Sequence, residues 1–308
     1  MQSQKQQCVV VIIGECYKVA KLIPMPTTPN FVTSNFTLVR TVGTTVSPFT
    51  GKTKTQEFDG VYWTAEVSLP PMRRDVALNW QSFLLDLNGP VNTFKFTDPD
   101  ALVNQGTYST AHLTSELRTN NTSVTLSFAS NGTLTAGAST FANTKVGDFI
   151  VVTGATNEEN NGTHKVTTVT SNTVVVTNGD FTTESNTASC KVRTNVKGAT
   201  GLSLRASTTG ASGTIKKGDY LSIQSSASSS GTPAQLVMVV EDATATSNAG
   251  NDFYSVKTEP KLRSDLASGH YVVFTNPKGN FRLVSNEVSW SADKISNYGI
   301  SFSCTEVI

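Results

Sequence analysis

Three histidines are the first candidates for chemistry, because imidazole transfers protons and binds metals near neutral pH. They are His112, His164 and His270. A catalytic or metal site needs several such groups gathered at a suitable spacing. Each histidine stands alone in Thr/Ser/Gly-rich or strand-end sequence, and no H-E-x-x-H pattern occurs. We therefore expect surface or satisfied histidines, and no metal site.

Nucleophilic serines and paired carboxylates are the next candidates. The chain has no G-x-S-x-G elbow. Asp98 and Asp100 flank Pro99, and two carboxylates can hydrolyse glycosides, but such pairs normally come from separate strands. A turn that ends a strand is the better interpretation. We expect no catalytic residue and no enzymatic activity.

A phosphate-binding loop is suggested by Gly51-Lys52-Thr53 and then rejected. The pattern requires glycine five positions before Gly51, where the chain has Val46, and it requires a helix where a strand is expected. We expect no cofactor. Arg73-Arg74 is a basic pair at a helix start, where positive charge is unfavourable. The pair is either solvated or opposite a partner's carboxylates.

The four cysteines also lack a metal-binding pattern. None of them belongs to a C-x-x-C motif or has a histidine at ligand spacing. Free thiols in a reducing cytoplasm are the expected state. The residues are Cys8, Cys16, Cys190 and Cys304.

Composition narrows the class of protein. The chain has 308 residues, 15% charged residues and a net charge of +1, which disfavours nucleic-acid recognition. Abundant Ser, Thr, Asn and Gly favour strands and turns over helix bundles. The apolar run from Cys8 to Ile13 is too short for the roughly 20 residues of a membrane span. Residues 1–24 read as an N-terminal extension, either a disordered arm or sequence upstream of a native start at Met25.

The pattern after residue 30 predicts strands. Phe36, Leu38 and Val39 begin one that Val42–Val46 continues, and a turn follows at residues 47–51. Asp59-Gly60 predicts a hairpin between residues 55–58 and 62–69. In the second of these strands apolar and polar residues alternate, so that one face is apolar.

One helix is predicted after Pro70-Pro71. Its apolar stripe has the helical period, and Asn88-Gly89 provides a left-handed stop. The helix should lie across the apolar face of the preceding sheet. The stripe consists of Val76, Trp80, Phe83, Leu84 and Leu87.

The middle of the chain contains an internal duplication. Residues 145–152 (KVGDFIVV) resemble residues 216–223 (KKGDYLSI), and each copy follows one short strand and precedes a strand pair. This pattern predicts two small β-barrel or sandwich modules in series. Strands at residues 271–274, 281–284, 288–291 and 298–304 follow, and we expect them to complete the N-terminal domain.

Two terminal blocks resemble the distal tail or minor tail proteins of siphophages and prophages. The first contains residues 47–51, Trp63 to Met72, Trp80 to Gly89 and residues 94–99; the second runs from Asn276 to Cys304. Family members share a W-x-A-x-[LV]-x-L-P-P-M strand, a W-x-x-F-L-x-x-L-x-G helix and a Y-G-I-S-F ending. Together the blocks cover a third to a half of the chain.

The resemblance implies a structural component of the virion, a tail-tip hub protein assembled in the host cytoplasm. It implies a ring homo-oligomer, a hexamer, that contacts the tail tube and other tail-tip proteins. No catalytic role follows from it. The shared positions are core or interface candidates: Trp63, Trp80, Phe83, Leu84, Phe281, Trp290 and Tyr298.

The predicted fold is mainly β. A β-sandwich with one packed α-helix is expected from both chain ends, at residues 25–110 and 270–308. The inserted β modules are expected at residues 115–192 and 196–268.

Two other functions remain open. The polar β modules would suit a receptor- or carbohydrate-binding minor tail protein with a host-surface glycan as partner, and Trp63, Trp290 and Tyr298 could form a sugar-stacking platform. A virion-associated hydrolase is the third hypothesis, and the inventory of catalytic groups disfavours it.

Overall fold

The chain divides into two compact units in a computed structural model. Unit 1 contains Met1–Val39, Tyr62–Phe96 and Asn280–Val307; unit 2 contains Arg40–Val61, Thr97–Gly279 and Ile308. The protein is mainly β, as predicted, and α1 is the single α-helix of the described part. The described residues are 11–12, 15–16, 20–108, 112–137, 139–206, 213–226, 231–248, 251–294 and 296–308.

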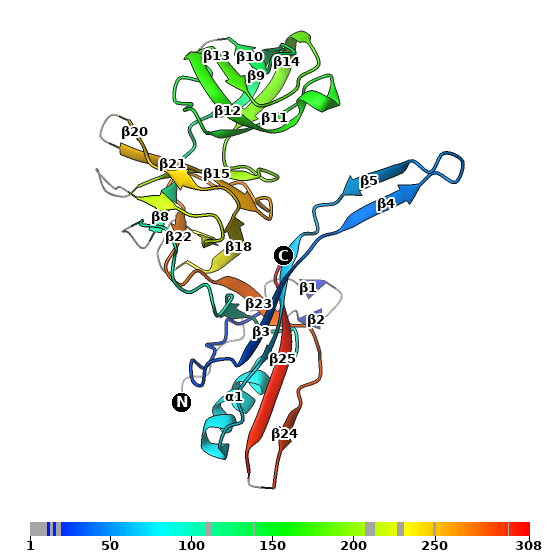
Figure 1. Cartoon of the computed structure of the whole chain (residues 1–308), viewed down its shortest axis with the longest axis vertical. Coiled ribbons are helices and arrows are strands. Elements are labelled where there is room, and N and C mark those ends of the chain that lie inside the picture. The colour runs from blue at the N-terminus through cyan, green and yellow to red at the C-terminus, as the bar shows by residue number, and fades with distance from the viewer. Residues whose placement is uncertain are drawn as a thin grey trace. The chain divides into compact units, whose positions relative to one another are not determined.

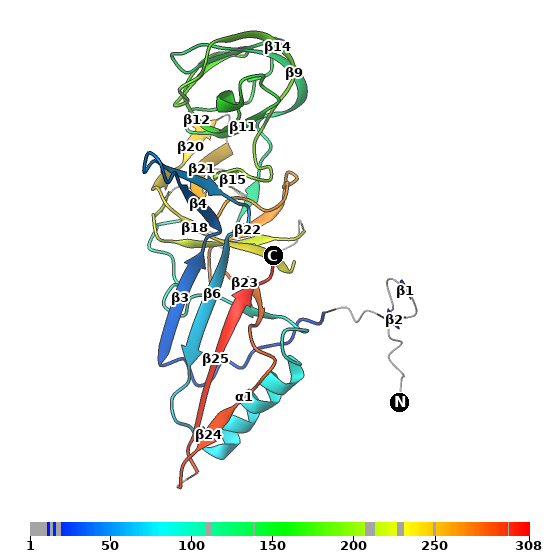
Figure 2. The same cartoon turned by 90° about the vertical axis from the view of Figure 1, so that its right-hand side faces the viewer.

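Unit 1 is built on an antiparallel sheet to which both halves of the chain contribute. An N-terminal strand, β6, lies between β3 and the C-terminal strand β25, as Figure 2 shows. The sheet order is β3-β6-β25-β23-β7, and β24 also pairs with β25. The strands are β3 (Thr33–Val39), β6 (Tyr62–Ser68), β7 (Phe94–Phe96), β23 (Gly279–Leu283), β24 (Trp290–Ala292) and β25 (Tyr298–Glu306).

Helix α1 (Arg74–Asp86) confirms the predicted helical stripe. Asn88 and Gly89 both have positive φ after its end, which is the predicted left-handed stop. Trp80 contacts Phe302 of β25 at a ring distance of 6.3 Å and Phe31 at 5.6 Å. The apolar stripe of α1 therefore faces side chains of the sheet.

The residues before Met25 are only partly described. Leu22 forms a parallel bridge with Thr93, and the backbone of Thr93 bonds to Lys21 and Ile23 on either side. Residues 21–23 therefore belong to unit 1, where their backbone groups form hydrogen bonds with Thr93. The predicted extension over residues 1–24 is thus wrong at its C-terminal end. Two short strands, β1 (Val11–Ile12) and β2 (Glu15–Cys16), pair with each other. The rest of residues 1–19, with the arm and start-site hypotheses, lies outside the described residues.

The predicted hairpin around Asp59-Gly60 is wrong. Strand β5 (Thr53–Glu57) pairs with β4 (Val42–Val46), whereas β6 pairs with β3 and β25. All five residues of β5 are exposed, so this strand has no apolar face to place beside β6. The turn of the hairpin is the predicted turn around residues 47–51.

A closed barrel forms the first part of unit 2, drawn in green in Figure 1. Leu126, Phe128, Ile150 and Val152 are buried in its core. The strand order is β10-β13-β12-β11-β14-β9. The strands are β9 (Asn120–Phe128), β10 (Thr133–Ala136), β11 (Phe149–Thr153), β12 (Gly162–Ser171), β13 (Val174–Thr177) and β14 (Glu184–Arg193), with the 3-10 turn η1 at Glu158–Asn160.

Unit 2 also contains the β4–β5 hairpin and a second barrel. The order is β15-β8-β22-β17-β18-β21-β20, and a further β15–β21 pairing closes it. Barrels or sandwiches were predicted here, and the structure has small closed barrels. The second barrel also takes β8 and β22, which lie outside the predicted module at residues 196–268. The strands are β8 (His112–Ser115), β15 (Gly201–Arg205), β17 (Tyr220–Gln224), β18 (Pro233–Val239), β20 (Thr246–Asn248), β21 (Asn251–Glu259) and β22 (Tyr271–Val273), with β16 (Thr214–Ile215) and β19 (Ala243–Thr244) paired separately.

The boundaries of the units differ from the predicted domains. Residues 40–61, 97–110 and 270–279 were expected in the terminal domain and belong to unit 2. Strand β22 pairs with β8 and β17, and its Val272 is fully buried in the core of unit 2. That burial holds the strand in the second barrel, although its sequence resembles the strands that follow it.

Candidate functional site

Five of the seven predicted core or interface residues lie in the interior of unit 1. Phe281 is completely buried and Trp80 is 1% exposed. Trp63 packs on Phe36 at a ring distance of 5.1 Å, and Phe281 packs edge-on to Phe96 at 5.4 Å. These positions are architectural. The five buried residues are Trp63, Trp80, Phe83, Leu84 and Phe281.

Sequence analysis missed half of this aromatic core. Trp80 and Phe83 connect to Phe281 through other rings, for which the sequence predicted no role. The alternation of apolar residues in those strands was the available signal. The additional rings are Phe31, Phe36, Phe94, Phe96 and Phe302.

Trp290 and Tyr298 lie apart from that core. They come from β24 and β25, where Ala292 pairs with Tyr298 and Trp290 pairs with Ile300. Trp290 is 43% exposed, whereas Trp63 is only 5% exposed. The three-ring sugar platform is therefore wrong, because a buried Trp63 cannot offer its face to a ligand.

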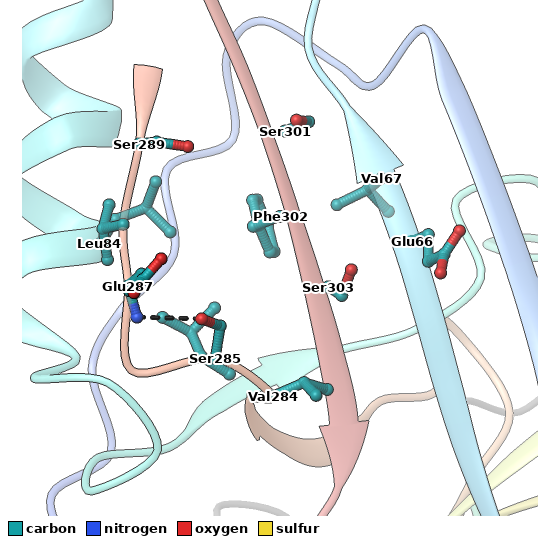
Figure 3. Close-up of a pocket in the computed structure, with 12 residues that line it drawn as sticks. Glu66, Val67, Leu84, Val284, Ser285, Glu287, Ser289, Ser301, Phe302 and Ser303 are labelled. Atoms are coloured by element: carbon teal, nitrogen blue, oxygen red, sulfur yellow. Dashed lines mark hydrogen bonds between the residues drawn. The ribbon is translucent and has the colours of Figure 1, made fainter.

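A groove of about 520 Å³ opens on the sheet of unit 1, beside β25. Figure 3 shows β25 in its centre, with Phe302, Ser301 and Ser303, and the coil of residues 284–289 on one side. Val67 and Leu84 line it from β6 and α1, and they are only 3% and 1% exposed.

The groove exists because β25 changes its neighbour at this point. Strand β23 pairs with β25 up to Leu283–Cys304, and β24 resumes the pairing at Trp290–Ile300. The N–H of Val284 still donates to the carbonyl of Ser303 at 3.1 Å, and residues 285–289 then leave the sheet between these two pairs. Residues 301–303 consequently have strand pairing with β6 alone.

The charge of the groove is negative. Glu66 and Glu287 line it on opposite sides of β25, as Figure 3 shows, and its lining contains no lysine or arginine. Both carboxylates are exposed, and neither forms an ion pair within the part of the chain that the structure describes. The groove thus combines an apolar floor with two uncompensated carboxylates.

The tip of the β4–β5 hairpin has the opposite character. Phe49 is 94% exposed, and Lys52 and Lys54 are exposed beside it. Neither lysine forms an ion pair with any described residue. The Gly51-Lys52-Thr53 sequence lies in this turn and leads into strand β5, where a phosphate-binding loop would lead into a helix.

Ion pairs fix the base of the same hairpin to the second barrel. Arg40 Nη1 lies 2.6 Å from Glu259 Oε1, and Lys261 Nζ lies 2.7 Å from Glu57 Oε2. The hydrogen bond from Lys261 and its charge lower the pKa of Glu57. The hairpin is therefore anchored at its base while its tip is free of contacts with aromatic or charged side chains in the described structure.

The duplicated turn uses its aspartate in the same way in both copies. Asp148 Oδ2 accepts the backbone N–H of Lys145 at 2.8 Å, and Asp219 Oδ2 accepts that of Lys216 at 3.0 Å. Asp219 also accepts the backbone N–H of Gln105 at 2.8 Å. Each aspartate thus closes its own turn and holds a second segment of the chain.

In the first copy, that second segment belongs to the neighbouring barrel. Arg118 Nη1 lies 2.5 Å from Asp148 Oδ1, and Ser255 Oγ donates to the same oxygen at 2.7 Å. The guanidinium also lies over the ring of Phe253, 4.4 Å from its centroid. Burial raises the pKa of Asp148, and the charge of Arg118 opposes that effect. Arg118 and Asp148 are buried and join the two barrels.

The other titratable groups are scattered. His112 stacks on Tyr271 and His164 packs on Phe181; burial lowers the pKa of both. Asp98 accepts the backbone N–H of Asp100, as expected of a turn. Cys190 and Cys304 are free and buried. In the described ranges, no group of three His, Cys, Asp or Glu residues is arranged to hold a metal ion.

The exposed basic pair Arg73-Arg74 has no ion-pair partner in the described part of the chain. None of the helices in that part has the length and apolar character that a membrane span requires.

A scan against protein-family models finds no match, and a search of curated proteins finds no significant relative.

Proposed function

We propose that the protein is a structural component of a phage tail tip, a distal tail or hub protein that joins the tail tube to tip or fibre proteins. In this proposal several copies form a closed ring, a hexamer, in the virion. The two barrels of unit 2 are insertions, and the protein has no catalytic role.

One observation supports the proposal more than any other. The motif blocks from the two ends of the chain, on which the resemblance to tail proteins rests, fold into one sheet with one helix against it. Strand β6 of the first block lies directly beside β25 of the second, with Ala65 opposite Cys304. Motifs that are 200 residues apart and meet in one core behave as parts of one scaffold.

The proposal retains a helix-backed β-sandwich as the hub domain, in which this sheet forms one layer. Ser301 and Ser303 of β25 and Glu66 of β6 are exposed, so that the sheet offers side chains to a neighbour. Strand β3 lies at the edge of the sheet, and all seven of its residues are exposed or half-buried. Such an edge is a template for association with another chain.

Assembly of the purified protein tests the proposal. Head-to-tail contacts that use two different surfaces close into rings, so light scattering, native mass spectrometry and electron microscopy should find a ring of defined copy number. A protein that stays monomeric at high concentration, alone and with the tail proteins encoded beside it, would contradict the proposal. Gene order provides an independent check, because the gene should follow one for a tape-measure protein.

A further inference from the structure

We propose that the tip of the β4–β5 hairpin of one copy docks into the groove beside β25 of a second copy. This inference rests on the proposed function, because it specifies the contact that builds the ring. The occupant is the tip segment, residues 47–54, with Phe49, Lys52 and Lys54 as its contact residues. The groove is the surface lined by Glu66, Glu287, Phe302 and their neighbours.

The hairpin needs a partner for physical reasons. A two-stranded hairpin with no third strand is marginally stable in water, and β5 buries none of its five residues. Phe49 at the end of this arm is 94% exposed, so covering it in an assembly would bury apolar area. With five residue pairs, the arm projects its tip by roughly 17 Å at the usual rise of a strand. The arm is thus long enough to reach beyond its own base.

The groove offers apolar and aromatic contacts for the exposed ring of Phe49. Its accessible apolar surface comes from the half-buried ring of Phe302 and from Val284 and Val288, of which Val284 is 58% exposed. A second ring entering there would meet an aromatic system that continues through Phe302 to Trp80. Edge-to-face ring contacts of this kind add to the gain from buried area.

Charge complementarity selects the tip over other occupants. Residues 47–54 contain two lysines and no acid, and the groove lining contains two glutamates and no base. Within the described chain these four groups have no ion-pair partners, so each copy carries an unmatched positive arm and an unmatched negative groove. Because the two surfaces differ, the contact is heterologous and can close into a ring. We expect the association to weaken as salt is added.

A charge-swap experiment tests the contact directly. The tip variant is Lys52→Glu/Lys54→Glu, and the groove variant is Glu66→Lys/Glu287→Lys. Each alone should self-associate at least about tenfold more weakly than the wild type, because like charges then face each other. An equimolar mixture of the two should regain the ring, since the positive tip of the groove variant fits the negative groove of the tip variant and the converse pair also matches.

Two matched controls carry the same charge changes on exposed positions of the barrels. They are Lys191→Glu/Lys217→Glu and Glu158→Lys/Asp180→Lys, and both should assemble like the wild type. Phe49→Ser should weaken assembly with no change of charge. Circular dichroism and thermal melts of every variant ensure that lost assembly is not lost folding.

A photo-crosslinker at position 49 identifies the occupied surface. In a mixture of ¹⁵N-labelled and unlabelled protein, mass spectrometry should find mixed-isotope crosslinks from position 49 to residues 284–289 or 301–303. If the wild type forms rings but the variants do so equally and the crosslinks fall elsewhere, the tip-in-groove contact is wrong and the hub proposal stands. A wild type that never assembles and never crosslinks between copies overturns both.

Discussion

Burial divides the side chains of unit 1 into two groups with different roles. Trp63, Trp80 and Phe281 have little or no exposure and hold α1 and the sheet together, whereas Trp290 is 43% exposed. The indole N–H of Trp80 also donates to the carbonyl of Thr28 at 3.0 Å. Single-residue changes should therefore separate stability from assembly.

We predict that Trp80→Ala lowers the free energy of unfolding of unit 1 by about 3–5 kcal/mol, the usual range for a truncated buried aromatic residue. Leu85→Ala on the same helix is the control, because Leu85 is 60% exposed and should change little. Urea unfolding followed by circular dichroism measures both. Similar effects of the two substitutions would show that α1 does not pack as described.

We predict that Arg118→Ala costs about 3–5 kcal/mol in unit 2, because it leaves Asp148 buried without its cation. The control is Arg193→Ala, which breaks the more exposed pair with Asp265 and should cost about 1 kcal/mol or less. Replacing both buried partners by apolar residues should cost less than Arg118→Ala alone. Equal losses from the two single arginine variants, in the same unfolding assay, would argue against a buried pair.

Glu184 gives the first barrel a dependence on acid. Burial alone would raise its pKa, but hydrogen bonds from Thr187 and from the backbone N–H groups of Thr156 and Asn157 outweigh this and lower the pKa to about 2. A carboxylate with a lowered pKa in the folded state stabilises the fold above its unfolded pKa, and this contribution is lost as the pH falls.

We therefore expect Glu184→Gln to be less stable than the wild type at pH 7, and the difference should shrink as the pH falls from about 5 towards 2. Urea midpoints over this pH range measure the difference, in which the titration of all other groups cancels. A difference that stays constant with pH would refute the role of this carboxylate.

Among the structural elements, the two duplicated turns show how backbone conformation selects the residue type. Both copies of the turn place glycine at positive φ, +92° at Gly147 and +94° at Gly218. A Cβ at Gly218 would meet nothing within 4 Å, and at Gly147 it would make only an ordinary contact with Ser255. These positions therefore require glycine because of their backbone conformation, and not because a side chain would lack space.

We predict that Gly147→Ala and Gly218→Ala each destabilise unit 2 by about 1–2 kcal/mol, the cost of a left-handed conformation for a residue with a Cβ. Gly→Asn at the same positions should cost less, because asparagine tolerates this region better. Thermal unfolding of the four variants gives the comparison. Unequal losses at the two glycines would mean that the copies do not share one turn geometry.

At the scale of the whole molecule, two units have separate cores. Unit 1 depends on the meeting of strands from both chain ends, and unit 2 on two closed barrels joined through Arg118 and Asp148. In the proposed ring the two units supply different halves of the contact between copies, since unit 1 provides the groove and unit 2 carries the β4–β5 hairpin.

We expect calorimetry to resolve more than one unfolding transition, because each unit buries its own apolar core. Trp80→Ala should shift one transition and Arg118→Ala another, since distant sites without shared partners act independently. A single transition that both substitutions shift to the same extent would show that the two units unfold as one.

The local elements follow from residue patterns along the chain. Helical spacing from Val76 to Leu87 predicted α1, alternation from Trp63 to Leu69 predicted β6, and the repeated Gly-Asp turns predicted two small barrels. Five of the seven proposed structural residues are buried as core positions. These features depend on periods and turn conformations that neighbouring residues set within a few positions.

The choice of which strands pair, and of which surfaces stay uncovered, depends on contacts between residues that are distant in the chain. The Asp59-Gly60 signal could not reveal that β5 pairs with β4, nor could the apolar run at β22 reveal its place in the second barrel. The groove arises because residues 285–289 leave β25 between two pairings, which no local pattern encodes. Strand pairing is chosen by burial against residues distant in the chain, so the groove and the arm became visible only together with the fold.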